Sequence, residues 1–198
     1  MNTEIAALKA ALPTLSARSQ EFANSLLAQA ERYNGILTEK QMFWVRKLIE
    51  DKPKPTVDLG NFSGVIKLFD GAARNLKHPK VRLKLTDGRP ITLSIAGQSS
   101  RFPGTVNVTD GGKFGANTWY GRVDTTGKFE LAGNIDAGTA ASITALLINF
   151  AANPAKVASD YGHTTGSCCF CAKTLTDDRS VSVGYGPICA DKFSLPWG

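Results

Sequence analysis

Hydrophobic residues recur at helical spacing through the first third of the chain. Between Ser16 and Tyr33 the apolar positions fall on Phe22, Leu26 and Ala30, which share one side of a helix. The same spacing, bounded by prolines and glycines, predicts four helices, over residues 3–12, 16–33, 39–51 and 63–76. The third of these is preceded by a capping box, Thr38 with Gln41 three residues later.

The middle of the chain alternates apolar and polar residues, as half-buried strands do. In "VRLKLTDGRPITLSI", residues 81–95, Val81, Leu83 and Leu85 alternate with basic residues, and a Thr-Asp-Gly-Arg turn leads into a second alternating run. Three further strands are predicted over residues 105–109, 118–124 and 128–132. This pattern favours an antiparallel sheet of about five strands with helices on one face.

Helical spacing returns after the predicted sheet. Residues 139–152 form an apolar helix, and Pro154 begins a short helix that ends near Tyr161. Pro53 and Pro55, near the end of the third helix, indicate a stiff linker between the N-terminal helices and the rest.

Composition points to an ordinary globular protein. The 198 residues are 42% hydrophobic and 20% charged, and four cysteines are too few for a disulfide scaffold. The N-terminus has no basic head or continuous apolar core, so we expect no signal peptide. The longest apolar run, residues 140–152, is too short to cross a bilayer. We therefore expect a soluble protein of a reducing compartment, the cytoplasm.

Three of the four cysteines and one of the two histidines lie in "HTTGSCCFC", residues 163–171. Cys168 and Cys171 have the C-x2-C spacing of a zinc knuckle, in which a tight turn aims two thiolates at one ion. The alternation after Asp177–Asp178 predicts a short hairpin. Pro187 then starts a helix, with Cys189 in its first turn. Knuckle, hairpin and helix-borne cysteine is the order of a treble-clef zinc site, and Gly184 and Gly186 would let the backbone approach the metal.

The fourth ligand and the role of the metal follow from the neighbouring residues. His163 is the best fourth candidate, with Cys169 and then Asp191 as alternatives. The deaminase signature H-x-E with P-C-x-x-C is absent, and so is H-E-x-x-H. We therefore expect a structural Zn²⁺ and no enzymatic activity.

The expected fold class is α+β: N-terminal helices packed on an antiparallel sheet of about five strands, with a treble-clef-like zinc module at the C-terminus. Three parts are predicted: a helical segment over residues 1–55, a sheet domain with flanking helices over residues 56–160, and the zinc-binding module over residues 161–198. Because the sheet domain has its own core, chelation should loosen only the third part.

The cysteine-rich tail resembles the C-terminal domain of a family of uncharacterised bacteriophage and bacterial proteins. The shared pattern is Tyr-Gly, Gly-x-Cys-x-x-Cys, Leu-Thr-Asp, Ser and Gly-x-Gly-Pro-x-Cys. Its positions here are Tyr161, Gly162, Gly166, Cys168, Cys171, Leu175, Thr176, Asp177, Ser180, Gly184, Gly186, Pro187 and Cys189. The resemblance implies a metal-binding domain of the kind attached to phage accessory or nucleic-acid-handling proteins. In that pattern the position of His163 is often another residue, so the three cysteines are the firmer ligand set.

The positive charge lies outside the tail. Residues 1–135 carry 19 basic and 12 acidic residues, whereas residues 136–198 carry four and five. Basic strand faces with exposed aromatic rings are typical of proteins that hold single-stranded nucleic acid, although Lys and Arg also simply solvate the outer face of a sheet. The candidate nucleic-acid contacts are Arg74, Lys77, Lys80, Arg82, Lys84, Arg89, Lys113, Phe114, Trp119, Tyr120 and Arg122.

These patterns favour two functions over a third, an enzyme that uses an open zinc position, for which no acid/base pair can be named. The first is a non-enzymatic, zinc-containing accessory protein of phage origin that binds nucleic acid, preferably single-stranded, through a basic sheet face. The second is a protein-interaction module that binds a host protein, because Met42, Phe43 and Trp44 give more apolar surface than one helix stripe needs. For a phage protein the compartment would be the host cytoplasm, and no membrane partner is expected.

Overall fold

The computed structural model describes residues 3–50 and 55–197, which fall in two compact units, Met1–Lys54 and Pro55–Gly198. Each unit has its own cluster of buried apolar side chains. Of the two prolines predicted to stiffen the linker, Pro53 lies outside the described residues. None of the described helices combines the length and the apolar character that a membrane span requires.

The N-terminal unit consists of helices around a small apolar core. The predicted capping box is present: the Gln41 amide donates to the Thr38 Oγ1 at 3.3 Å, and the Thr38 amide donates to the Gln41 side chain at 2.8 Å. Its elements are α1 (Thr3–Ala11), the 3-10 turn η1 (Leu12–Thr14), α2 (Ala17–Arg32) and α3 (Glu39–Glu50). Its core is built from Leu8, Leu15, Ala23, Leu26, Met42, Val45 and Leu48.

The second unit contains a six-stranded sheet in the order β1-β6-β5-β4-β3-β2, with every pair antiparallel. Five strands match those predicted. The sixth, β1, was not predicted, because its three residues are too few to show an alternating pattern. The strands are β1 (Thr56–Asp58), β2 (Lys80–Lys84), β3 (Pro90–Ile95), β4 (Val106–Thr109), β5 (Trp119–Val123) and β6 (Lys128–Leu131).

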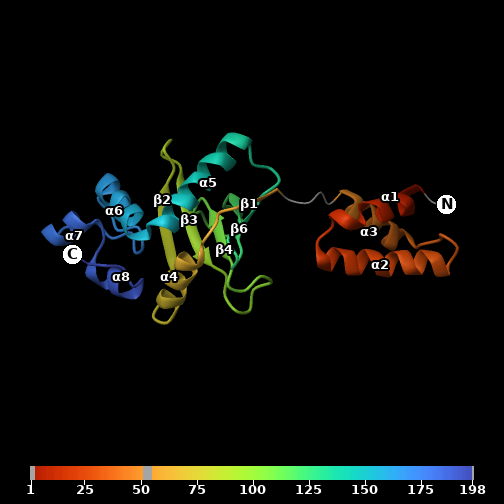
Figure 1. The fold of residues 1–198 in the computed structure, drawn as a ribbon, viewed down its shortest axis with the longest axis horizontal. Coiled ribbons are helices and arrows are strands. Elements are labelled where there is room, and N and C mark those ends of the chain that lie inside the picture. The colour runs from red at the N-terminus through yellow and green to blue at the C-terminus, as the bar shows by residue number, and fades with distance from the viewer. Residues whose placement is uncertain (1–2, 51–54, 198) are drawn as a thin grey trace. The chain divides into compact units, whose positions relative to one another are not determined.

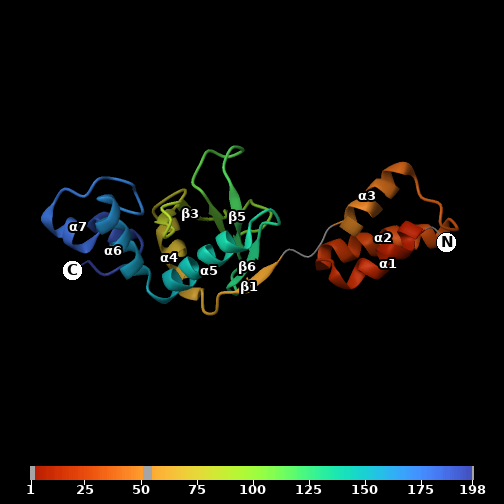
Figure 2. The same cartoon turned by 90° about the horizontal axis from the view of Figure 1, so that it is seen from above.

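One face of the sheet forms the core, and the other is polar. In register, Val81 lies opposite Leu93, and Leu93 lies opposite Val108. Two helices, α4 (Ser63–Ala73) and α5 (Ala137–Ala152), cover this apolar face (Figures 1 and 2). The opposite face carries a row of polar side chains across five paired strands, namely Lys80, Ser94, Asn107, Arg122 and Glu130.

Three helices follow α5 and lie beside the β2 edge of the sheet (Figure 1). They are α6 (Pro154–Thr165), α7 (Asp178–Val183) and α8 (Pro187–Lys192). The predicted hairpin after Asp177 is wrong, because α7 occupies its place. The Asp177 side chain accepts from the Ser180 amide at 2.9 Å, and Gly184 ends the helix at φ 88°. These end signals outweigh an alternation only three residues long.

The cysteine-rich tail shares its core with the sheet. Cys168, Phe170 and Phe193 belong to the same buried cluster as the side chains under α4 and α5. The Phe170 ring stacks on the Phe193 ring with a centroid distance of 4.2 Å. Residues 161–198, predicted as a module apart, therefore lie in one compact unit with the sheet.

Candidate metal centre

The C-x2-C segment forms a tight knuckle directly after α6. Gly166 ends that helix in the left-handed conformation, at φ 66°. A single β-bridge between Ser167 and Thr174 then closes the base of the turn. Within it, the Cys168 amide donates to the Lys173 carbonyl at 2.9 Å, and the Ala172 amide donates back to the Cys168 carbonyl at 2.8 Å. The knuckle geometry predicted from the spacing is thus present.

The third cysteine arrives from α8. Gly186 precedes the helix, Pro187 opens it, and Cys189 lies in its first turn. The Sγ atoms of Cys168, Cys171 and Cys189 all lie within 4.8 Å of one another. Cys168 and Cys189 are buried, whereas Cys171 is exposed. Among the described residues, these three form the one group of histidine, cysteine and carboxylate side chains close enough to share an ion.

The environment of the cluster favours a thiolate at Cys168. The Cys189 thiol beside it and the backbone amides of Cys171, Gly186 and Phe170 lower the pKa of Cys168 to about 5, although burial opposes this shift. The same contact raises the pKa of Cys189, because removing a second proton would place two negative charges side by side. A cation between the sulfurs would remove that repulsion.

Three convergent sulfurs are a donor set that suits a soft or borderline metal ion. Thiolates bind Zn²⁺ in tetrahedral sites, whereas Mg²⁺ and Ca²⁺ prefer oxygen. The residues present therefore fit a zinc-type ion. Cys168, Cys171 and Cys189 would hold it, and its contribution would be to fix the knuckle to the start of α8.

Arg82 joins the knuckle to the sheet. Its backbone amide donates to the Cys169 carbonyl at 2.8 Å, and its Nη1 donates to the Phe170 carbonyl at 2.8 Å. Because β2 is the outermost strand, this amide faces away from the sheet and is available to the knuckle. The guanidinium of Arg82, a predicted nucleic-acid contact, is thus hydrogen-bonded within the protein.

Two glycines of the tail allow α6 to cross the end of α7 at backbone distance. A Cβ atom at Gly162 would lie 1.9 Å from the Gly184 carbonyl oxygen, and one at Gly184 would lie 2.4 Å from the Ser159 carbonyl oxygen. The expectation that Gly184 lets the backbone approach the metal is therefore replaced by a packing role. Gly186 does lie at the metal site, since its amide favours the Cys168 thiolate.

The three candidate fourth ligands lie outside the sulfur cluster. The Nε2 of His163 lies 2.9 Å from the Ser182 carbonyl, with which it links α6 to α7. Cys169 is fully buried, and burial raises the pKa of its thiol well above the ordinary value. Asp191 is exposed on α8. None of them belongs to the group of ligand atoms that the described residues bring together.

The predicted nucleic-acid residues are divided between the two ends of the sheet. The register places Lys80 at the end where β3 leaves the sheet, and Arg74 and Lys77 precede it. Lys84 lies at the opposite end, beside the β2–β3 turn. The β4–β5 loop reaches this same end, because Thr109 pairs with Thr92. That loop carries exposed Lys113 and fully exposed Phe114, and the half-buried Trp119 and buried Tyr120 follow on β5.

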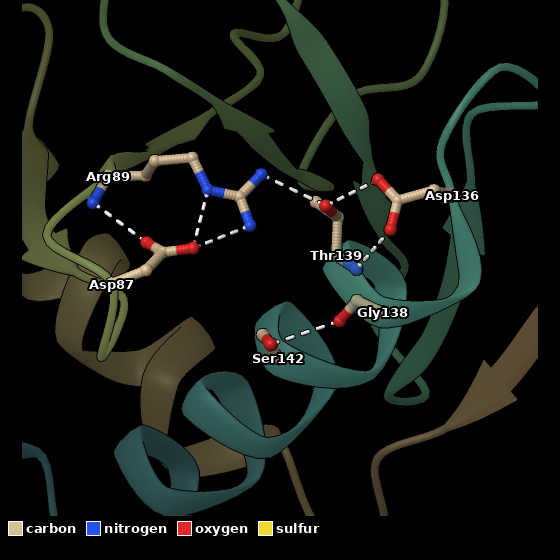
Figure 3. A network of polar contacts seen from close by, with 6 residues as sticks. All are labelled: Asp87, Arg89, Asp136, Gly138, Thr139 and Ser142. Atoms are coloured by element: carbon tan, nitrogen blue, oxygen red, sulfur yellow. Dashed lines mark hydrogen bonds and ion pairs between the residues drawn. The ribbon is translucent and has the colours of Figure 1, made fainter.

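Arg89 is part of a polar network that fastens the β2–β3 turn to α5 (Figure 3). Its Nε donates to Asp87 at 2.7 Å, and its Nη1 donates to the Thr139 Oγ1 at 2.9 Å. Thr139 in turn donates to Asp136, the residue that caps α5. These bonds lower the pKa of Asp87 and raise that of Arg89. Like Arg82, Arg89 is engaged within the protein.

Arg122 is engaged too, and its surroundings include residues that the sequence did not single out. It forms an ion pair with Glu130, and its guanidinium carbon lies 3.5 Å from the Phe102 ring centroid. The Arg101 guanidinium lies 5.2 Å from the same ring. Arg101 and Phe102 lie in a loop without periodicity. The one sequence signal for them is that a basic and an aromatic residue are neighbours.

Comparison with known proteins finds a similarity within this tail. Residues 158–194 match a protein family described as a family of unknown function, DUF6011. The matched segment holds all three clustered cysteines, Arg82's partners in the knuckle, and both packed glycines. No curated protein and no solved structure matches the chain.

Proposed function

We propose that the chain is a non-enzymatic, zinc-containing accessory protein of phage origin that binds single-stranded nucleic acid on the polar face of its sheet. Its expected location is the host cytoplasm. The metal would act structurally, because two of its three sulfurs are buried in the core that the tail shares with the sheet.

Zinc is favoured by the donor set and is directly measurable. Metal content after purification without added metal should give one zinc per chain. A Cys168→Ser, Cys189→Ser variant should hold none. A wild-type protein without bound metal that also takes up neither Zn²⁺ nor Co²⁺ on titration would contradict the proposal.

The observation that supports nucleic-acid binding is the Phe102 ring with two guanidinium groups close to it. The ring is 41% exposed and lies beside Arg101 and Arg122, next to the polar row that begins at Lys80. Aromatic rings flanked by cations hold single strands elsewhere, since bases stack on the rings and phosphates follow the charge. We assign the contact surface to this end of the sheet and not to the end that carries Phe114.

The two ends of the sheet offer a matched test. A Lys80→Glu, Arg101→Glu variant changes as much charge as a Lys84→Glu, Lys113→Glu variant, and all four side chains are exposed. Oligonucleotide binding across a salt series should weaken strongly in the first variant only, with a salt dependence lower by about 0.7 per lost phosphate contact. Equal losses in both variants, or no binding by the wild type at low salt, would contradict the assignment.

A second function, binding of a host protein, is supported by three rings on the N-terminal unit. Phe22, Phe43 and Trp44 are 42%, 54% and 42% exposed, and Trp44 meets both other rings edge-on. Exposed apolar clusters of this kind mark interaction sites. Capture of a host protein that survives nuclease treatment and is lost in a Phe43→Ser, Trp44→Ser variant would favour this function over the first.

A further inference from the structure

We propose that a metal ion held by Cys168, Cys171 and Cys189 takes its fourth ligand from outside residues 55–197. The ligand would be a neutral nitrogen or oxygen donor, an imidazole or a water molecule. This inference rests on the proposed metal binding and specifies its chemistry.

The cluster is open on one side. Cys168 is 1% exposed and Cys189 is 9% exposed, so the inner side of the sulfur triangle is closed by the core. Cys171, at the tip of the knuckle, is exposed. An external donor therefore has access to the ion from the side of Cys171.

The side chains best suited to complete the site are committed elsewhere. Neither ring nitrogen of His163 joins the three sulfurs, and its Nε2 lies 2.9 Å from the Ser182 carbonyl of α7. The Cys169 thiol is fully buried. Its backbone carbonyl is held by the Arg82 amide, so the peptide cannot turn to present its sulfur without breaking that bond. Within residues 55–197, no histidine, cysteine or carboxylate side chain joins the three sulfurs.

Charge favours a neutral donor. Three thiolates and a divalent cation carry a net charge of −1, and a fourth thiolate would raise this to −2 beside two buried sulfurs. Burial of charge without a partner is costly. Water and imidazole add no charge; imidazole completes Cys3His sites, and water takes the fourth position where a protein supplies three ligands. The ion would still have a structural role, because two of its three sulfurs are buried in the core.

Imidazole is the probe for the open position, with the full-length protein loaded with Co²⁺. Titration with imidazole should shift the visible ligand-field bands in a saturable manner and leave the sulfur-to-cobalt charge-transfer band in place. X-ray absorption of the zinc-loaded protein should count three sulfurs and one lighter donor. Four sulfurs, or bands that do not change at saturating imidazole, would overturn the inference.

Variants separate an external donor from one within the chain. We expect His163→Ala, Asp191→Ala, Cys169→Ser and Ser180→Ala to bind Co²⁺ with unchanged affinity. Ser180 is included because its Oγ is buried and lacks a hydrogen-bond partner among the described residues. Loss of the four-coordinate ligand-field bands of Co²⁺ in any of them, with its fold retained by circular dichroism, would identify an internal ligand and overturn the inference. A wild-type protein that binds neither Co²⁺ nor Zn²⁺ would instead contradict the proposed metal function itself.

Discussion

The Arg82 guanidinium and the Phe170 carbonyl, 88 positions apart in the chain, form a 2.8 Å hydrogen bond. With the bond from the Arg82 amide to Cys169, it fixes two consecutive carbonyls of the knuckle to the edge of the sheet. Orientation of these peptides determines where the flanking thiols point. Arg82 is therefore a positioning residue for the metal centre, although it touches no sulfur.

Substitution of Arg82 should weaken metal binding. Arg82→Ala removes the side-chain bond and keeps the backbone bond, so we expect metal affinity to fall by about tenfold, as for other residues that orient metal ligands. Lys84→Ala is the matched control, since Lys84 is an exposed basic residue on the same strand. Competition between the protein and a coloured chelator for Co²⁺ gives both affinities. Equal effects of the two substitutions would show that Arg82 has no such role.

Metal removal should destabilise the whole second unit and not the tail alone. The sheet and the tail share one buried cluster, so the ion stabilises both. At free metal 100 times above its dissociation constant, binding to the folded state contributes about 2.7 kcal/mol. Hydrogen exchange with and without chelator should show faster exchange in β2 and β3 as well as in residues 161–197, and no change in residues 3–50. Faster exchange confined to residues 161–197 would instead support the sequence-based expectation that chelation loosens only the tail.

The pKa of Cys168 determines a pH dependence of the metal-free protein. It is lowered to about 5 in the folded state from an ordinary value near 9. Between these values the unfolded chain binds the proton more tightly, so this group adds stability as pH rises from 5 towards 9 and adds none below 5. Cys189, whose pKa is raised, acts in the opposite direction above 9. Urea unfolding of the metal-free protein against pH, with Cys168→Ser as the comparison, measures the contribution.

The pH dependence of metal affinity should also be set by the Cys168 thiol. Above about pH 5 Cys168 is already a thiolate, so the metal has no proton to displace from this sulfur. Below that value a proton on Cys168 competes with the metal. Metal affinity plotted against pH should therefore steepen below about 5, and proton release measured at pH 7 should be less than three per metal bound.

The close approach of α6 to the end of α7 predicts a sharp effect of one methyl group. Gly162→Ala places a carbon 1.9 Å from the Gly184 carbonyl oxygen, so backbone must move and we expect a loss of about 2–3 kcal/mol in the free energy of unfolding. Gly166→Ala is a useful comparison, because it has a left-handed φ of 66° but open space around its Cβ. A smaller effect of the first substitution than of the second would contradict the packing argument.

Sequence reasoning recovered most of the fold because its signals were long. The alternation over residues 81–95 and the helical stripes after Ser16 and Ala137 extend over many residues, and the structure follows them. It missed β1, which is short, and it placed a hairpin at α7, where two flanking caps outweighed three alternating residues. Short segments are decided by their ends and by tertiary packing, which periodicity does not register.

The candidate site was predictable to the extent that it is local. The spacing of Cys168 and Cys171, and the helix start before Cys189, are visible in the chain, and the structure brings their sulfurs together. The partners of Arg82, Arg89 and Arg122 are not visible in the sequence, because each depends on contacts between distant segments. A basic residue on a strand looks the same in sequence whether it faces solvent or holds a neighbouring carbonyl.

The knuckle also covers β2, the edge strand of the sheet. The last strand of an open sheet invites a strand from another molecule, and here the outward amide of Arg82 is already occupied by Cys169. Because metal removal weakens the sheet and the knuckle together, it would also weaken the bond that occupies this amide. An unoccupied β2 edge can pair with a strand of a second chain, so metal-free protein should self-associate more than metal-loaded protein.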